Sequence, residues 1–158
     1  MALSKLSEDE QRIVFTQLCN VLDPGVAVAF SSASSELWAL TQAMRQQLKA
    51  EHEAATALCL KVGMRSCKEL REAKEARWQD KGLTAADLGL LGTLGSVLPA
   101  LEKLRLIDSS AGAGPDGVLR LAEGLSAGAL PSVTTFEFVS VHVGDAGASA
   151  LAAALGRG

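Results

Sequence analysis

Two similar segments in the last third of the chain constrain its fold more than any other feature. The segment 98–106, Leu-Pro-Ala-Leu-Glu-Lys-Leu-Arg-Leu, returns at 130–138 as Leu-Pro-Ser-Val-Thr-Thr-Phe-Glu-Phe, an offset of 32 residues. A loop, a Gly and apolar residues four positions apart follow each segment, so each unit predicts a short strand and then a helix. Units with a period of about 30 residues stack to bury a shared core, and they commonly form binding surfaces.

Composition favours a folded chain and argues against several classes of function. Hydrophobic residues make up 48% of the chain but aromatic residues only 4%, so Leu and Ala must supply most of the core. The net charge of −3 provides no positive excess for a phosphate backbone, and we expect no nucleic-acid partner. No run approaches the ~20 apolar residues of a transmembrane helix, and no signal or transit peptide is evident, so we expect no membrane partner.

The three cysteines, Cys19, Cys59 and Cys67, are scattered and odd in number. This pattern favours reduced, buried thiols in an intracellular protein, and we expect a cytoplasmic or nuclear location. His52, Cys59 and Cys67 are spaced so that they can align on one helical face, but the tight spacing and the fourth ligand of a metal site are missing. We therefore expect neither a metal nor a cofactor.

The N-terminal half predicts helices. Apolar residues at helical spacing indicate three short helices over 6–48 and further helix over 50–80, with a break at Gly63 and an end near Trp78. Polar residues that satisfy free N–H groups at a helix start support these elements. The candidate starts are Ser7 with Glu10, Asp23 with Pro24, and Ser66 with Glu69.

Gly82 marks the expected boundary between two regions. Thr84 and Asp87 form a further capping box before a helix over 83–97, which corresponds to the helical half of a degenerate repeat. We therefore predict an α/β fold with a helical region at 1–81 and a repeat region at 82–158. The repeat region would contain one half-repeat and two full repeats, and the helical region would cap them.

The repeated positions form a pattern of apolar residues and one glycine. The first unit has Leu101, Leu104, Leu106, Gly117, Leu121 and Leu125, and the second has Val133, Phe136, Phe138, Gly147, Leu151 and Leu155. This pattern resembles the leucine-rich repeats of the ribonuclease-inhibitor type. The resemblance implies a concave parallel sheet, convex helices, and ligand contacts from outward strand positions. These positions are Lys103, Arg105, Thr135 and Glu137; the Asn usual after the strand is absent, and Ser109, Ser110 and Ser140 stand nearby.

A second resemblance covers residues 6–40. The segment contains Leu6-Ser-Glu-Asp, Ile13, Phe15, Leu18, Leu22-Asp-Pro24, Val26, Phe30, Ser34 and Leu37-Trp38. This order resembles an F-box, a helical module that docks onto the adaptor subunit of cullin-type ubiquitin ligases and often precedes leucine-rich repeats. The resemblance implies adaptor contacts from Leu6, Ile13, Leu22, Pro24 and Val26. The alternative is that these helices are only a structural cap.

No motif of the chain predicts catalysis. His52-Glu53 lacks the second His of a zinc protease motif, and the serines between 31 and 35 lack the elbow of a hydrolase nucleophile. The segment 112–117 has no Lys-Ser/Thr ending, and Pro115 removes a donor that a phosphate would need. We therefore predict a non-enzymatic interaction module or scaffold, with an F-box-type substrate receptor of a ubiquitin ligase as the alternative.

The last predicted strand, 134–139, has no further unit to pair with. It contains the apolar Phe136 and Phe138, and an open apolar edge invites pairing with another chain. Since about three stacked units are usually needed for stability, we expect either a longer repeat array or an edge that a partner or a second copy covers.

Overall fold

The computed structural model describes residues 5–108 and 112–156. The chain divides into two compact units, the first ending at Thr56 and the second beginning at Ala57. The sequence-based boundary between 81 and 82 lies inside the second unit. The described residues form eight α-helices and a three-stranded parallel sheet, so the fold is mixed α/β as expected. Within these residues, no helix is long and apolar enough to cross a membrane.

The first unit is a small cluster of helices around one buried aromatic ring. Its elements are α1 (Glu8–Leu18), α2 (Gly25–Ser31), α3 (Ser35–Leu40) and the greater part of α4 (Gln42–Lys61). Phe15, Ala27 and Leu48 form the core, and Phe30 and Met44 are among the half-buried side chains that pack on it. The capping box at the start of α1 is confirmed, because the Ser7 side chain accepts a hydrogen bond from the Glu10 N–H and the Glu10 side chain accepts one in return.

Two helix boundaries of the first unit differ from expectation. Pro24, not Asp23, occupies the N-cap of α2, so this helix begins one residue later. The third expected helix is divided at Thr41, where α3 ends and α4 begins. The buried Thr41 hydroxyl donates to the Leu37 carbonyl at 2.7 Å, a local bond that competes with regular helix geometry.

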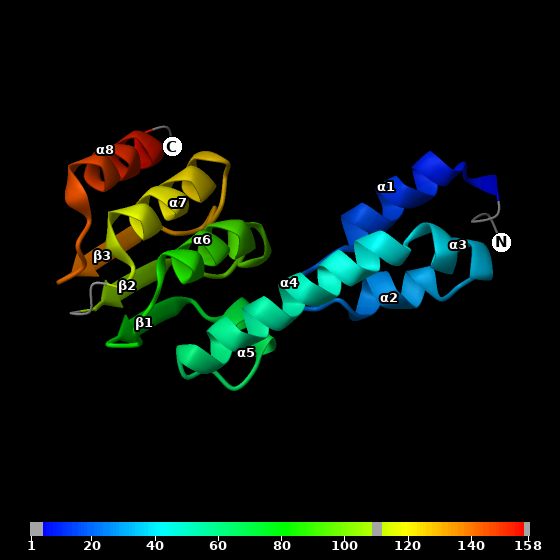
Figure 1. The fold of residues 1–158 in the computed structure, drawn as a ribbon, viewed down its shortest axis with the longest axis horizontal. Helices are drawn as coiled ribbons and strands as arrows, with labels where there is room; N and C mark the ends of the chain where they lie inside the picture. The colour runs from blue at the N-terminus through cyan, green and yellow to red at the C-terminus, as the bar shows by residue number, and fades with distance from the viewer. Residues whose placement is uncertain (1–4, 109–111, 157–158) are drawn as a thin grey trace. The chain divides into compact units, whose positions relative to one another are not determined.

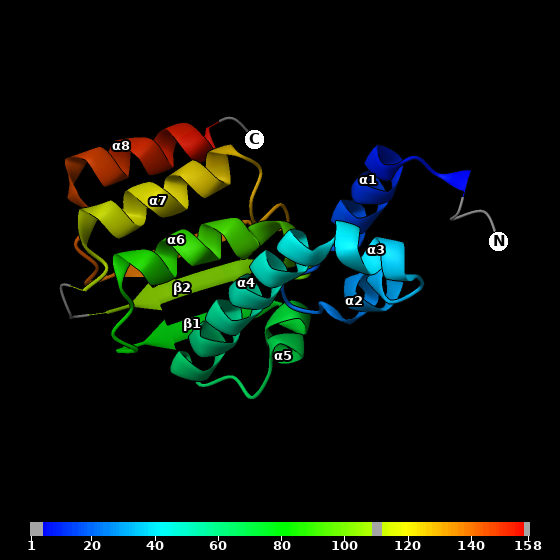
Figure 2. The same ribbon diagram turned by 45° about the vertical axis from the view of Figure 1, so that its right-hand side comes forward.

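The second unit alternates strands and helices. After the end of α4 come α5 (Cys67–Glu72), β1 (Glu75–Gln79), α6 (Ala85–Leu94), the 3₁₀ turn η2 (Gly95–Val97), β2 (Lys103–Ile107), α7 (Gly114–Ser126), β3 (Thr135–Val139) and α8 (Gly144–Leu155). The strands are parallel and lie in the order β1-β2-β3, which is their order along the chain. Figures 1 and 2 show α6, α7 and α8 side by side along one face of this sheet.

The prediction of a helix that ends near Trp78 is wrong. The helix α5 ends at Glu72, and residues 75–79 form strand β1 instead. Ala76 and Trp78 alternate with exposed residues in this strand, and both side chains are buried. Pairing with β2 and burial of the indole outweigh the helix-forming tendency of the local charged residues. The break predicted at Gly63 is confirmed, with a positive φ of 88° just after α4.

The strand register aligns the buried side chains of the sheet in two rows. One row contains Ala76, Leu104 and Phe136, and the other contains Trp78, Leu106 and Phe138. In these two rows, the side chains from β1 and β2 are at most 3% exposed, whereas the two Phe side chains from β3 are half-buried. Other buried leucines of this unit lie in α6 and α7 (Leu88, Leu91 and Leu121) and in the segment between η2 and β2 (Leu98 and Leu101).

Glycines allow the repeated helices to pack closely. A Cβ atom on Gly124 of α7 would lie 2.6 Å from the Cα atom of Gly92 in α6, so Gly124 has no room for a side chain, and a Cβ atom on Gly92 would make a tight contact of 3.3 Å with the Arg120 carbonyl oxygen. Gly114 and Gly144 have positive φ angles of 52° and 68° where α7 and α8 begin, a conformation that glycine adopts without strain. The repeat in the sequence thus corresponds to a repeat in backbone conformation.

Candidate functional site

Nine side chains of the sheet point away from the helices. Successive side chains of a strand point to opposite faces, so the odd-numbered residues of all three strands share this surface, which we call the open face. Its rows follow from the register: Glu75, Lys103 and Thr135; Arg77, Arg105 and Glu137; Gln79, Ile107 and Val139. Six of these residues are exposed, and Arg105, Ile107 and Val139 are half-buried.

The structure places all four strand residues that the sequence singled out on the open face. Lys103 lies opposite Thr135, and Arg105 lies opposite Glu137. Sequence reasoning missed the first column, Glu75, Arg77 and Gln79, because it assigned these residues to a helix. The alternation of Ala76 and Trp78 with charged residues is the signal that could have found them.

One ion pair crosses the open face. The Nε atom of Arg105 lies 3.0 Å from Oε2 of Glu137, with side chains 37% and 46% exposed. The Nε–H is buried but has no hydrogen-bond acceptor among the described residues, so charge attraction rather than an aligned hydrogen bond holds this contact. Solvent-exposed pairs contribute at most about 1 kcal/mol, and this pair orients Arg105 more than it stabilises the sheet.

A buried carboxylate lies at the end of β2. Asp108 is 4% exposed, and its Oδ2 accepts a hydrogen bond from the Leu83 N–H at 3.1 Å. Its own N–H donates to the Val139 carbonyl, so this residue connects the loop before α6 to the last strand. Sequence reasoning gave Asp108 no role and considered Ser109 and Ser110 instead, which lie outside the described residues. An acidic residue directly after a buried strand is the signal that was available.

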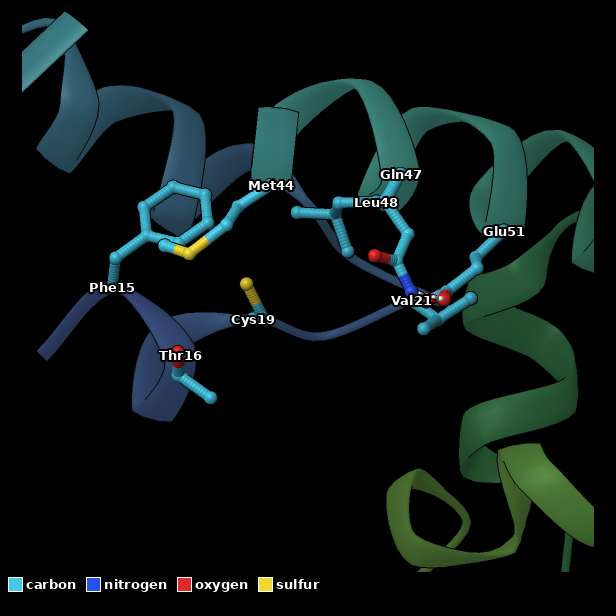
Figure 3. A pocket seen from close by; sticks show the side chains of 8 residues that line it. All are labelled: Phe15, Thr16, Cys19, Val21, Met44, Gln47, Leu48 and Glu51. Carbon is cyan, nitrogen blue, oxygen red and sulfur yellow. Dashed lines mark hydrogen bonds between the residues drawn. The ribbon is translucent and has the colours of Figure 1, made fainter. Parts of the chain in front are cut away.

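The first unit contains a small apolar pocket beside α4. Figure 3 shows Phe15, Cys19, Val21, Met44 and Leu48 around it, with Thr16, Gln47 and Glu51 completing the lining. The pocket has a volume of about 200 Å³, and a hydrogen bond of 2.9 Å joins Gln47 to Glu51. Burial, and next to it the charge of Glu51, raises the pKa of Cys19, which disfavours the thiolate a nucleophile would need.

The residues proposed for adaptor docking differ in exposure. Ile13 and Val26 are 61% and 55% exposed, so both are accessible to a partner. Leu22 is buried, and Leu6 and Pro24 are half-buried, so these three residues are less accessible to a partner.

Other polar groups considered from the sequence have structural partners. Ser31 and Ser32 donate to the Val28 carbonyl, and His52 Nδ1 lies 2.6 Å from the Val21 carbonyl oxygen. The Sγ atoms of Cys59 and Cys67 lie 3.8 Å apart in the second unit. In the part of the chain that the structure describes, no three His, Cys, Asp or Glu side chains are grouped to hold a metal ion.

No family model matches the chain, and no curated protein and no solved structure is significantly similar to it. Its function must therefore be inferred from its own residues and geometry.

Proposed function

We propose that the second unit is a short leucine-rich-repeat solenoid of the ribonuclease-inhibitor type whose open face binds a protein partner. The supporting observation is the order of the sheet: three parallel strands follow one another in chain order, and each is followed by a helix on the same face. Such strand–helix units stack along one direction, with each unit contacting its neighbours. Within the second unit, the end of α4 and α5 precede β1 and cap the stack.

The open face supports binding better than chemistry. It presents charged, polar and apolar side chains on a rigid scaffold, which is the mixture found at protein–protein interfaces. The protein acts without catalysis, metal or cofactor, as an interaction module or scaffold. The face carries three basic and two acidic side chains, too even a balance to favour nucleic acid, and the buried thiols Cys59 and Cys67 suit the reducing cytoplasm or nucleus.

A bulky substitution on the open face tests this proposal. Thr135 is exposed, so Thr135→Trp adds volume to the face without disturbing the core. Proteins that cross-link to the wild-type chain should be lost from this variant and retained by Arg120→Gln, which changes an exposed residue of α7 on the helical layer. Equal retention of every cross-linked protein by both variants would rule out the open face as the binding surface.

A specific observation favours the second candidate, an F-box-type substrate receptor of a ubiquitin ligase. Four of the six large apolar side chains that the described residues expose lie in the first unit: Ile13, Val26, Val28 and Trp38. Exposed apolar surface of this kind is typical of a docking site. In this case the first unit would contact the ligase adaptor, and the open face would hold the substrate.

Co-sedimentation with a cullin-ligase adaptor subunit tests this candidate. The variant Ile13→Asp/Val26→Asp should abolish co-sedimentation, whereas Leu155→Asp, at an exposed apolar position of α8, should preserve it. Leu22 is unsuitable for this test, since it is buried and its replacement would unfold the unit. A wild-type chain that does not sediment with the adaptor would exclude the receptor function.

Self-association through β3 belongs to the same proposal. Thr135 N–H bonds to Glu102 and the Val139 carbonyl accepts from Asp108, so alternation places the main-chain groups of Phe136 and Phe138 at the free edge. A second copy could pair along this edge. Sedimentation equilibrium should then show a concentration-dependent dimer that Val139→Lys weakens, because an edge lysine discourages pairing. A monomer at every concentration would contradict this.

A further inference from the structure

The middle row of the open face places two arginines side by side. Arg77 of β1 is the register partner of Arg105 of β2, and both side chains lie on the open face. Neighbouring strands are about 4.8 Å apart, so the two arginine side chains leave the sheet from adjacent positions. Like charges directly opposite each other in a sheet are destabilising, so this arrangement calls for an anionic neighbour.

Among the residues that the structure describes, an ion pair neutralises Arg105 but not Arg77. Glu137 forms the ion pair with Arg105 from the side of β3. Arg77 makes neither an ion pair nor a side-chain hydrogen bond within the described residues, and it is exposed. In the adjacent row, Lys103 adds a third positive charge and its register partner Glu75 adds a negative one. Within the described residues, no carboxylate therefore forms an ion pair with Arg77, and the position between Arg77 and Arg105 is open to a carboxylate of a partner.

An apolar strip lies next to this position. Ile107 and Val139 are neighbours in the third row, two residues further along their strands, and both are half-buried. Two residues along a strand correspond to about 6.6 Å, which is also the separation of side chains i and i+2 in an extended peptide. Because the strip lies between β2 and β3 and the arginines between β1 and β2, an extended partner that crosses the strands obliquely, with an acidic and an apolar side chain two residues apart, would match both features.

We propose that the open face binds an extended acidic protein segment, with an Asp or Glu carboxylate between Arg77 and Arg105 and an apolar side chain, two residues away, against Ile107 and Val139. This inference rests on the function proposed for the open face and specifies the partner. A carboxylate held by two guanidinium groups forms charge-assisted hydrogen bonds, which are stronger than neutral ones. Arg77 selects the acidic residue, and Glu137 keeps the guanidinium of Arg105 in place.

A nucleic acid would satisfy the arginines less well. Glu75 and Glu137 flank the basic residues on both sides, and a phosphate backbone that follows the face would meet these carboxylates. A short acidic segment needs only one cationic position and avoids this repulsion.

Selection of displayed random peptides on the immobilised full-length chain is the first test. The bound peptides should be enriched in Asp or Glu two residues from an apolar side chain, in either order. Affinities of the recovered peptides are then measured by fluorescence anisotropy. Arg77→Gln should weaken binding by about tenfold or more, since it removes a charged partner of the carboxylate, and added salt should weaken wild-type binding. Arg120→Gln, an exposed arginine of α7, should leave the affinity unchanged.

Thr135→Trp separates failure of this inference from failure of the proposed function. Loss of binding in Thr135→Trp together with normal binding in Arg77→Gln would retain the open face as the binding surface and overturn the acidic partner. Normal binding in both variants would overturn both proposals. Recovery of no peptide, of peptides without acidic residues, or preferential binding of a single-stranded oligonucleotide would also overturn the acidic segment as the partner.

Discussion

The two units of the molecule bury their apolar side chains to different extents. Of the twelve largest fully buried side chains among the described residues, eleven belong to the second unit, and only Phe15 belongs to the first. Conversely, most of the large apolar side chains that remain exposed belong to the first unit. The second unit shows charged and polar residues on the open face, whereas the first shows apolar residues such as Ile13 and Val26.

This contrast indicates a division of roles. The second unit buries leucines between its parallel sheet and the helices that cover it, so its core is large enough to hold a precise arrangement of surface charges. A unit of 56 residues buries a smaller share of its surface and depends on a few contacts around one ring. A partner that docks on the first unit, as proposed above, would cover its exposed apolar residues.

Removing the ring of Phe15 should have the largest effect on stability. Phe15→Ala empties the centre of the first unit, and such truncations cost about 3–5 kcal/mol, as much as a unit of this size can lose before it unfolds. Hydrogen exchange followed by mass spectrometry should show loss of protection in α1 and α2, while β2 and α7 remain protected. Ile13→Ala, at a 61% exposed position two residues away, should change little. Equal loss of protection in β2 would show that the two units unfold as one.

Adding one methyl group should have opposite effects in the two units. Gly124→Ala would place a Cβ atom 2.6 Å from Gly92, forcing α6 and α7 apart at a cost of about 1–3 kcal/mol. In Gly25→Ala, the added Cβ atom would lie 3.5 Å from its nearest neighbour, Asp23 Oδ1, which is an ordinary contact. Alanine in a helix is also more favourable than glycine by up to about 1 kcal/mol. Urea denaturation of both variants measures this difference. A destabilised Gly25→Ala variant, or an unaffected Gly124→Ala variant, would contradict the packing described for that unit.

The sequence predicted strands β2 and β3 better than strand β1. Strands near 103–107 and 135–139 were recognisable because each has apolar residues at alternate positions and a second copy to compare with. Strand β1 has only Ala76 and Trp78, set among charged residues at helical spacing, so local propensity favoured a helix. Its pairing with β2 is a tertiary contact that no local pattern contains. The unneutralised Arg77 was missed for the same reason.

The buried thiols should make stability depend on pH in the second unit. Burial, and next to it the neighbouring Cys67, raises the pKa of Cys59 from 9.0 to about 12. Because the pKa is higher in the folded than in the unfolded state, the protonated thiol contributes fully to the free energy of unfolding below about pH 9. This contribution is lost as the pH rises toward about 12. The urea midpoint of the wild type should therefore fall between pH 8 and pH 10.5 more than that of Cys59→Ala. The chain has no Tyr, so no phenol titrates in this range. If the urea midpoints of the two proteins changed with pH in parallel, the raised pKa of Cys59 would be contradicted.

The ion pair on the open face should have the smallest effect on stability, although it lies at the proposed binding position. Arg105 and Glu137 are both more than one third exposed, so water and salt screen their attraction. A double-mutant cycle of Arg105→Gln and Glu137→Gln should give a coupling of less than about 1 kcal/mol in the free energy of unfolding, and high salt should remove it. A coupling well above 1 kcal/mol would instead make the pair part of the sheet's stability.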